Sequence, residues 1–361
     1  MINEKEFILQ CLNFTDPNTE KISVLLNKNL DMPWILGQAM FHRVGGIIYY
    51  NLYKNNLLEN MNREIKNSLK MIYEYQKIKN KIYFEDLIKI NENIKNIDSF
   101  VYLKGSILNT AIFPNGTRYS NDYDILTEKS NIHLLDKPLK QDGFVQGKIN
   151  ENKITEATRK EILNSLYNRG ETIPYVKEEK NHNIEIDINF SLECKTSQSD
   201  ELLKNMLANK VTYKIGDHEI ASLNKTDFVI FLFLHLYKEA VNIWWVNKDR
   251  DLSLYKFLDI EVMINNFNEN DIEVLCNTSK KFNIQKEVYY CIDKLMQITR
   301  NNKNLTLYKI ILDKLDFAPD EKLNDIVSLS SDEHYYYKDF EEYLFSYNHK
   351  NLIFKREEDN V

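Results

Sequence analysis

Apolar residues recur at three- and four-residue steps through most of the first 96 positions, and this period predicts helices. The pattern is clear in Pro33–His42, where Asp31 can cap the N-terminus and Pro33 suits the first turn. Met61–Ile94 is rich in Lys, Glu, Ile and Tyr and holds no Gly or Pro. We therefore expect one or two amphipathic helices in that segment.

The pattern changes to short apolar runs beyond residue 97. Residues 99–104 and Tyr123–Leu126 predict strands, and Ser106–Ala111 is expected to open the helix between them. Ile184–Phe190 alternates strictly between apolar and polar residues, which is typical of a half-buried strand. Residues 150–180 are polar and give an ambiguous pattern, which fits a segment that is part helix and part flap.

Turn signals and a return to helical spacing complete the outline. Ile132–Lys137 predicts a short helix that Pro138 should end, and Asp142-Gly143 marks a turn. From Asp200 onward the spacing predicts helices. The clearest are Thr226–Ala240, Leu252–Asn265, Ile272–Phe282 and Lys286–Thr299.

These elements predict an α+β fold with three regions. A small mixed-sheet domain over residues 97–200 is flanked by N-terminal helices over residues 1–96 and by a C-terminal helical bundle over residues 201–361. The 361 residues exceed the usual length of one domain, and the scarcity of glycine (nine) and proline (six) favours helices over a turn-rich β-sandwich.

Charge and cysteine content narrow the class of protein. The net charge of −7 disfavours a long nucleic acid as partner, because such proteins usually carry a basic face. The four cysteines have no CxxC spacing, so we expect buried, reduced thiols and a cytoplasmic protein. The N-terminus lacks a basic start followed by an apolar stretch, and Phe228–Leu234 is too short to span a membrane, so neither a signal peptide nor membrane attachment is expected.

The candidate chemistry lies in the mixed-sheet region. Asp122 and Asp124, two positions apart on a strand, should point to the same face, where the two carboxylates repel unless a cation lies between them. Oxygen ligands of this kind suit Mg²⁺ or Mn²⁺. Gly105 and Ser106 precede a predicted helix and could offer backbone N–H groups to a phosphate. Asp187, on the alternating strand, could supply a third carboxylate for a two-metal site.

This constellation resembles the polymerase-beta-like nucleotidyltransferase superfamily, which is marked by a glycine-serine turn, an Asp-x-Asp strand and a third acid. More narrowly, the chain is similar to a bacterial family of uncharacterised nucleotidyltransferases over roughly residues 30–265. The matching segments are Leu103-Lys104-Gly105, Phe113-Pro114, Arg118, Asp122–Leu126, His42-Arg43-Val44, Asp142-Gly143-Phe144, His235 and Asp259. One position departs from the family pattern, since Asn189 stands where relatives carry a histidine two residues after the third acid.

The resemblance implies a Mg²⁺- or Mn²⁺-dependent enzyme that moves a nucleotidyl group from an NTP to an acceptor and releases pyrophosphate. Asp122, Asp124 and Asp187 would hold the metal ions and act in catalysis, and Gly105 with Ser106 would bind phosphates of the NTP.

Several further residues have more than one interpretation. Arg118 could contact phosphate or pair with the acids, and Lys104 could bind the nucleotide, form a salt bridge or face solvent. Glu185 shares a face with Asp187 and could be an additional ligand or a partly exposed strand acid. His235 and Lys238 could face the nucleotide from one helical surface, whereas a core position is the plainer interpretation of His235.

The acceptor is left open by the sequence. A small molecule or a peptide is favoured. The alternatives are a toxin-like enzyme that acts on tRNA or protein, and a non-catalytic nucleotide-binding scaffold, for which Asn189 is the only hint.

Overall fold

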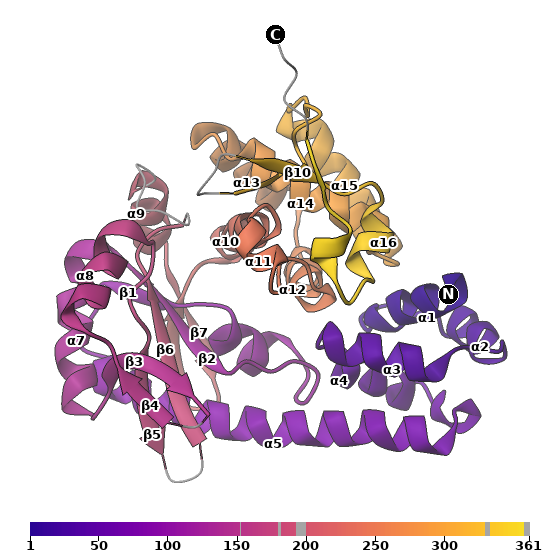
Figure 1. The fold of residues 1–361 in the computed structure, drawn as a ribbon, viewed down its shortest axis with the longest axis horizontal. Helices are drawn as coiled ribbons and strands as arrows, with labels where there is room; N and C mark the ends of the chain where they lie inside the picture. The colour runs from indigo at the N-terminus through magenta and orange to yellow at the C-terminus, as the bar shows by residue number, and fades with distance from the viewer. Residues whose placement is uncertain (152, 180–181, 193–199, 329–332, 357–361) are drawn as a thin grey trace. The chain divides into compact units, whose positions relative to one another are not determined.

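The computed structural model describes residues 1–151, 153–179, 182–192, 200–328 and 333–356. Contacts divide the chain into two compact units (Figure 1). The sheet unit is Gln76–Phe231, and the helical unit combines Met1–Tyr75 with Leu232–Val361. Two helices, α5 (Arg63–Ile94) and α10 (Lys225–Ala240), each continue from one unit into the other.

The helical unit begins with short helices, as the sequence predicts. They are α1 (Ile2–Leu12), α2 (Thr19–Leu26), α3 (Met32–Phe41), α4 (Gly45–Lys54) and the 3-10 helix η1 (Leu58–Asn60). The predicted start of α3 is confirmed, because the Asp31 carboxylate accepts a hydrogen bond from the Trp34 backbone N–H at 3.0 Å and proline stands in the first turn. The single long helix α5 confirms the amphipathic segment before the sheet.

The second segment of the helical unit supplies the C-terminal helices and a small sheet. Its helices after α10 are α11 (Ile243–Val246), α12 (Leu254–Ile264), α13 (Glu269–Lys281), α14 (Gln285–Ile298), α15 (Asn302–Leu315), α16 (Phe340–Leu344) and the 3-10 helix η4 (His349–Asn351). Strands β9 (Ile326–Val327), β10 (His334–Tyr336) and β11 (Phe354–Lys355) pair in the order β11-β10-β9. The predicted helical bundle is thus present and carries a small sheet in addition.

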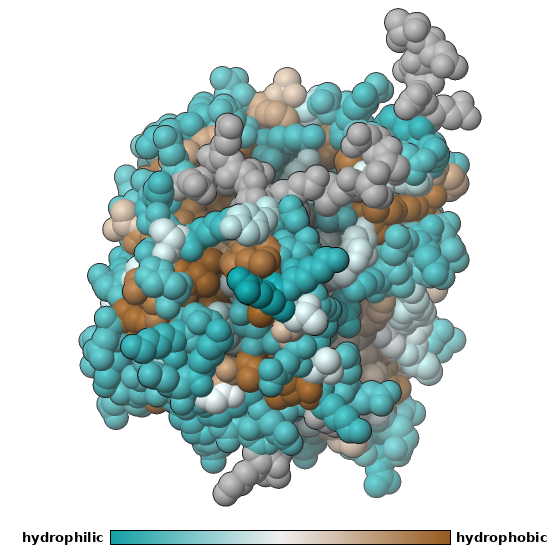
Figure 2. All heavy atoms as spheres, turned by 60° about the vertical axis from the view of Figure 1, so that its left-hand side comes forward, coloured by the Kyte–Doolittle hydropathy of each residue, from teal (hydrophilic) through white to brown (hydrophobic). Residues whose placement is uncertain are grey.

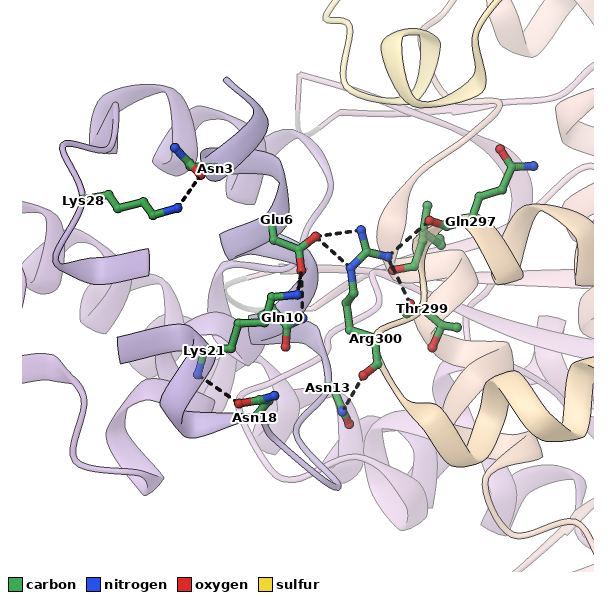
Figure 3. A network of polar contacts seen from close by, with 11 residues as sticks. Asn3, Glu6, Gln10, Asn13, Asn18, Lys21, Lys28, Gln297, Thr299 and Arg300 are labelled. Carbon is green, nitrogen blue, oxygen red and sulfur yellow. Dashed lines mark hydrogen bonds and ion pairs between the residues drawn. The ribbon is translucent and has the colours of Figure 1, made fainter. Parts of the chain in front are cut away.

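A polar network joins the two segments of the helical unit. The Arg300 guanidinium binds the Glu6 carboxylate of α1 at 2.8 and 2.9 Å, and the Arg300 carbonyl accepts a hydrogen bond from Asn13 at 3.3 Å (Figure 3). Lys21 adds a second cation 2.6 Å from Glu6. The first helix is therefore fixed to a residue almost 300 positions later, beside a core that includes Phe7 and Ile8.

The described part of the sheet unit holds eight strands in the order β4-β3-β5-β6-β2-β1-β8-β7. The strands are β1 (Phe100–Tyr102), β2 (Asp122–Thr127), β3 (Val145–Asn150), β4 (Lys153–Glu156), β5 (Tyr175–Glu179), β6 (His182–Asn189), β7 (Val211–Ile215) and β8 (His218–Ser222). The β2–β6 and β1–β8 pairs are parallel and the other pairs antiparallel, so the sheet is mixed as predicted. The helical pieces between the strands are α6 (Gly105–Ile107), the π-helix η2 (Leu108–Ile112), η3 (Lys129–Asn131), α7 (Ile132–Gln141), α8 (Arg159–Asn168) and α9 (Asp200–Ala208).

Two helices contact one face of the central strands. On α5, the Tyr83 ring stacks on Tyr123 of β2 at 4.2 Å between centroids. On α7, the Asp136 carboxylate accepts a hydrogen bond from the Tyr175 hydroxyl of β5 at 2.7 Å. Tyr123 alternates with Asp122 and Asp124, so the aromatic face of β2 carries these helices and the two carboxylates project from the opposite face.

The prediction that Pro138 ends its helix is wrong, because α7 runs on to Gln141. Proline removes only the hydrogen bond that residue 138 would donate to residue 134. The buried residues Leu135 and Leu139 hold the helix on both sides of this gap. The helix ends instead at the predicted turn, where Gly143 has a φ of +91°.

The prediction of continuous helix from Asp200 onward is wrong between α9 and α10. Val211–Ile215 and His218–Ser222 form an antiparallel hairpin at the edge of the sheet, and Gly216 at its turn has a φ of +60°. The β-branched and aromatic residues of Val211-Thr212-Tyr213 favour strand, and Gly216-Asp217 is a turn signal. The predicted boundaries of the three regions, at residues 96/97 and 200/201, stay predictions.

The remaining sequence predictions concern thiols and surface. Cys11, Cys276 and Cys291 are buried and form no disulfide, as expected, while Cys194 lies outside the described residues. Within the described ranges, helices are either too short or too polar for a membrane span. Hydrophilic side chains predominate on the face shown in Figure 2, with hydrophobic ones in separate areas between them.

Candidate active site

Four acidic residues form a row where β2 and β6 pair. The parallel register places Asp122 beside Glu185 and Asp124 beside Asp187, so all four side chains project from one face of the sheet. The predicted trio is thereby brought onto neighbouring strands. Glu185, which the sequence left ambiguous, lies in the same row.

The electrostatics of this row are those of a repelling cluster. Burial, together with the charges of Asp124, Asp122 and Glu185, raises the pKa of Asp187 well above its usual value. Burial and the charge of Asp124 likewise raise the pKa of Asp122, against the opposing attraction of Lys104 and Arg118. Burial and the charge of Asp122 raise the pKa of Glu185. Asp122, Glu185 and Asp187 are therefore harder to ionise in this row than alone, and a cation among the acids would relieve the repulsion.

Lys104 supplies one such cation from the end of β1. Its ammonium lies 2.7 Å from the Asp124 carboxylate, and the two side chains are 19% and 4% exposed. Of the interpretations open from the sequence, the structure selects the salt bridge. Lys104 reaches it through a strained backbone, with a φ of +38° and a ψ of −114°.

The Gly105-Ser106 turn lies next to the acids but is already engaged in hydrogen bonds. The Ser106 backbone N–H donates to the Leu103 carbonyl at 3.1 Å, and Ser106 Oγ lies 3.1 Å from the Tyr83 hydroxyl. The Tyr83 hydroxyl in turn donates to the Asp122 carbonyl at 3.0 Å. Phosphate binding by Ser106 therefore remains a prediction and would require this hydrogen-bond chain to rearrange.

Gly105 has a steric role that its residue type explains. A Cβ at this position would collide with Ser120 Oγ and lie 3.0 Å from the Tyr83 hydroxyl. Helix α6, which begins at Gly105, is only one turn long and passes directly into the π-helix η2. The sequence predicts a regular helix at this place.

Arg118 is a buried organiser of the loop before β2. Its Nη1 donates to Asn109 Oδ1 at 2.5 Å and to Ser120 Oγ at 2.9 Å. The residue as a whole is only 6% exposed. Its charge also reaches Asp122, whose pKa it helps to hold down against burial. Arg118 thus acts on the acids through position and charge, and contact with phosphate remains a prediction.

Lys238 and His235 lie on the part of α10 that belongs to the helical unit, whereas the acids belong to the sheet unit. His235 lies 3.5 Å from Glu239, which also binds Lys256 at 2.6 Å. The assignment of Lys238 to the nucleotide stays a prediction.

Asn189 ends β6 on the same face as Asp187, two residues further along. It is buried and its amide donates to the Ile125 carbonyl at 3.4 Å, which ties β6 to β2. At this position the chain therefore has a structural amide that cannot titrate.

The acids of this row form a donor set for a divalent cation in kind but not in arrangement. Among the described residues, no three or more His, Cys, Asp or Glu side chains converge closely enough to hold a metal ion. In kind, however, the donors fit Mg²⁺ or Mn²⁺, because they are all carboxylate oxygens whose mutual repulsion a cation would reduce. In the structure the ammonium of Lys104 takes part of that role at Asp124.

Comparison with known proteins identifies the family of the chain. The profile of a family described as "Uncharacterised nucleotidyltransferase" matches residues 28–297, three quarters of the chain and the whole of the sheet unit. The chain belongs to this uncharacterised nucleotidyltransferase family. No curated protein matches it.

Sequence reasoning missed three residues that position the site. Tyr83 anchors the Gly105-Ser106 turn from α5, and Asn109 and Ser120 hold Arg118. Ser120 lies within the sequence segment Arg118–Asp124, and its closeness to the acids in the sequence could have indicated a role in the site. Tyr83 lies in an ordinary amphipathic helix and gives no local signal of its partner 23 residues away.

Proposed function

We propose that this protein transfers a nucleotidyl group from an NTP to a hydroxyl on a small molecule or peptide, with release of pyrophosphate. The observation that carries the proposal is the row of four carboxylates on β2 and β6, beside two cationic side chains. Family membership supports nucleotidyl transfer in general. The requirement for Mg²⁺ or Mn²⁺, the acceptor and the residue roles are parts of the proposal.

In this proposal, Asp122, Asp124 and Asp187 would hold the metal. When bound, Mg²⁺ supplies Lewis acidity at the phosphates and lowers the pKa of a coordinated hydroxyl. Asp187 is proposed to help take the proton of the acceptor hydroxyl, because it lies beside Asp124 on the neighbouring strand, next to the proposed metal ligands. The acceptor oxygen then bonds to the α-phosphorus, and the bond from that phosphorus to the pyrophosphate oxygen breaks.

The residues around the acids would orient the nucleotide. Lys104 and Arg118 provide positive charge, and the Gly105-Ser106 turn and Lys238 are proposed as further contacts to the triphosphate. We assign the reaction to residues 97–200, which contain every one of these residues except Lys238. The acidic net charge of −7 supports a small molecule or a peptide over tRNA as acceptor.

The test is nucleotide transfer from labelled NTPs with Mg²⁺ and pools of candidate acceptors. Asp122→Asn and Asp187→Asn should each lower the rate roughly 10³-fold, because metal-held charge contributes several kcal/mol and 1.36 kcal/mol is tenfold. Glu178→Gln on the neighbouring strand is the matched control, since Glu178 is exposed. Wild-type-like transfer by Asp187→Asn would exclude the proposed role.

A stability measurement separates lost chemistry from lost fold. Because the pKa of Asp187 is raised in the folded protein, its ionised form opposes folding at every pH above its ordinary value. Asp187→Asn should therefore melt at a higher temperature than wild type at pH 7 in a chelator, while it loses activity. Binding of NTP·Mg²⁺ without transfer to any acceptor would favour the scaffold alternative.

A further inference from the structure

Lys104 occupies a backbone conformation that L-amino acids rarely adopt. With a φ of +38° it lies between β1 and the Gly105-Ser106 turn, and the following residue is already a glycine. Strain of this kind persists where the surrounding structure fixes it, and it gathers at functional sites. A glycine at position 104 would relieve the strain, so the lysine side chain is the feature to be explained.

The strained backbone directs that side chain back toward the carboxylate row. The Leu103 backbone N–H donates to the Asp124 carbonyl at 2.9 Å, and the Lys104 ammonium then reaches the Asp124 carboxylate at 2.7 Å. Asp124 thus contacts two consecutive residues: its carbonyl binds the backbone of Leu103, and its carboxylate binds the side chain of Lys104. The ammonium lies where the register concentrates negative charge, since Asp187 is the partner of Asp124.

We propose that Lys104 is an internal counter-ion that neutralises Asp124 in the resting protein and moves to the triphosphate when a Mg²⁺-bound nucleotide enters. The inference rests on the proposed function and concerns how its site is regulated. An ammonium and a divalent cation compete for the same carboxylate oxygen. The nucleotide's phosphates offer the displaced ammonium a new partner, and the four-carbon stem of lysine allows the movement.

The proposal predicts effects of opposite sign on two ligands. Loss of the ammonium should strengthen binding of a metal ion alone, because its competitor is gone. It should weaken binding of the nucleotide, because one phosphate contact is lost. A permanent structural ion pair predicts no tighter binding of the metal ion, since its removal would only disorder the acids.

The first experiment measures Mn²⁺ binding without nucleotide, by the electron paramagnetic resonance signal of free Mn²⁺, in wild type and Lys104→Met. We expect Lys104→Met to bind Mn²⁺ at least tenfold more tightly than wild type. It should also bind the non-hydrolysable analogue α,β-methylene-ATP with Mg²⁺ at least tenfold more weakly. The matched control is Lys177→Met, because Lys177 pairs with Asp142 at 3.1 Å and its side chain is 22% exposed. Its Mn²⁺ affinity should equal that of wild type.

Equal or weaker Mn²⁺ binding by Lys104→Met overturns the proposal, and so does the absence of Mn²⁺ binding from both proteins. Failure of the counter-ion role and failure of the proposed function give different results. If wild type transfers nucleotide but Lys104→Met binds Mn²⁺ as wild type does, only the counter-ion role fails. If the opposite-sign effects appear but no protein transfers nucleotide, only the proposed function fails.

A second measurement on the wild type covers the case that Lys104→Met does not fold. The acetylation rate of Lys104 by an N-hydroxysuccinimide ester is followed by peptide mass spectrometry, with Lys177 as the internal control. Saturating Mg²⁺ alone should free the ammonium and raise this rate at least threefold, and addition of α,β-methylene-ATP should lower it again. A Lys104 rate that Mg²⁺ leaves unchanged overturns the proposal.

Discussion

At the scale of single residues, the site depends on close contacts that few side chains could satisfy. Gly105 lies against Ser120 and Tyr83, and Ser120 in turn accepts a hydrogen bond from Arg118. The absence of a side chain at residue 105 therefore fixes the position of a cation that acts on Asp122. A change of one methyl group here should affect both stability and the site.

We predict that Gly105→Ala lowers the free energy of unfolding by about 1–3 kcal/mol, the usual cost of forcing extra volume into a packed site. The new methyl group must displace Ser120 Oγ and so disturb Arg118. Urea denaturation provides the measurement. The double variant Gly105→Ala/Ser120→Gly removes the colliding atoms and should recover part of the loss. An unchanged midpoint for the single variant would contradict the predicted collision.

The sequence revealed the acids but not what surrounds them. Asp122 and Asp124 followed from their i, i+2 spacing, and Asp187 from the alternation of its strand. The contact of Lys104 with Asp124 depends on an unusual φ that no local pattern encodes. The bonds of Ser106 to Tyr83 join distant elements and become visible only when α5 lies on the sheet.

At the scale of elements, strong hydrophobic periodicity correctly predicted helices and strands, whereas the single residue Pro138 predicted a helix end that the structure does not have. The alternation of β6 and the long helical pattern of α5 were both confirmed. The β7–β8 hairpin was missed because a short, half-exposed edge strand carries little apolar alternation. Pro138 does not end its helix as predicted, because two buried leucines hold the helix on both sides of the missing hydrogen bond.

We predict that Pro138→Ala stabilises the protein by about 1–2 kcal/mol. Alanine restores an N–H donor to residue 134 and has a much higher helix propensity, although it also makes the unfolded chain more flexible. Thermal or urea unfolding measures the change. Lys137→Ala is the control, since it alters an exposed neighbour in the same helix. A destabilised Pro138→Ala would show that the proline ring itself contributes packing that alanine lacks.

At the scale of the whole molecule, one compact unit is assembled from two distant stretches of chain. Residues 1–75 and 232–361 form the helical unit, and the sheet unit with the carboxylate row lies between them in the sequence. The Glu6–Arg300 contact is one of the ties between the two stretches (Figure 3). No local pattern could have revealed it, because the partners are 294 residues apart.

We predict that Glu6→Gln lowers the free energy of unfolding by about 1–2 kcal/mol at pH 7, less than the full pKa shift implies because water screens this partly exposed carboxylate. Burial alone would raise the pKa of Glu6, but hydrogen bonds from Arg300, Lys21 and Gln10 outweigh it and lower the pKa to about 2. Because the folded pKa is depressed, this stabilisation is complete above the ordinary value of 4.5 and is lost as the pH falls toward 2.

Denaturant unfolding at a series of pH values is the measurement. The difference between Glu6→Gln and wild type should shrink steadily between pH 4.5 and pH 2. Glu20→Gln, at an exposed acid of α2, should behave as wild type throughout. A difference that does not depend on pH would mean that the Glu6 charge is not the source of the stabilisation.

The divided helical unit also sets an order of events on the ribosome. Glu6 of helix α1 is made before its partner Arg300, which follows 294 residues later, roughly 15–60 s afterwards at about 5–20 residues per second. The sheet unit is one continuous stretch, so it can fold during that interval. The helices that precede the sheet unit must therefore wait for their later partners with apolar surface uncovered, and chaperones that bind nascent chains should find them there.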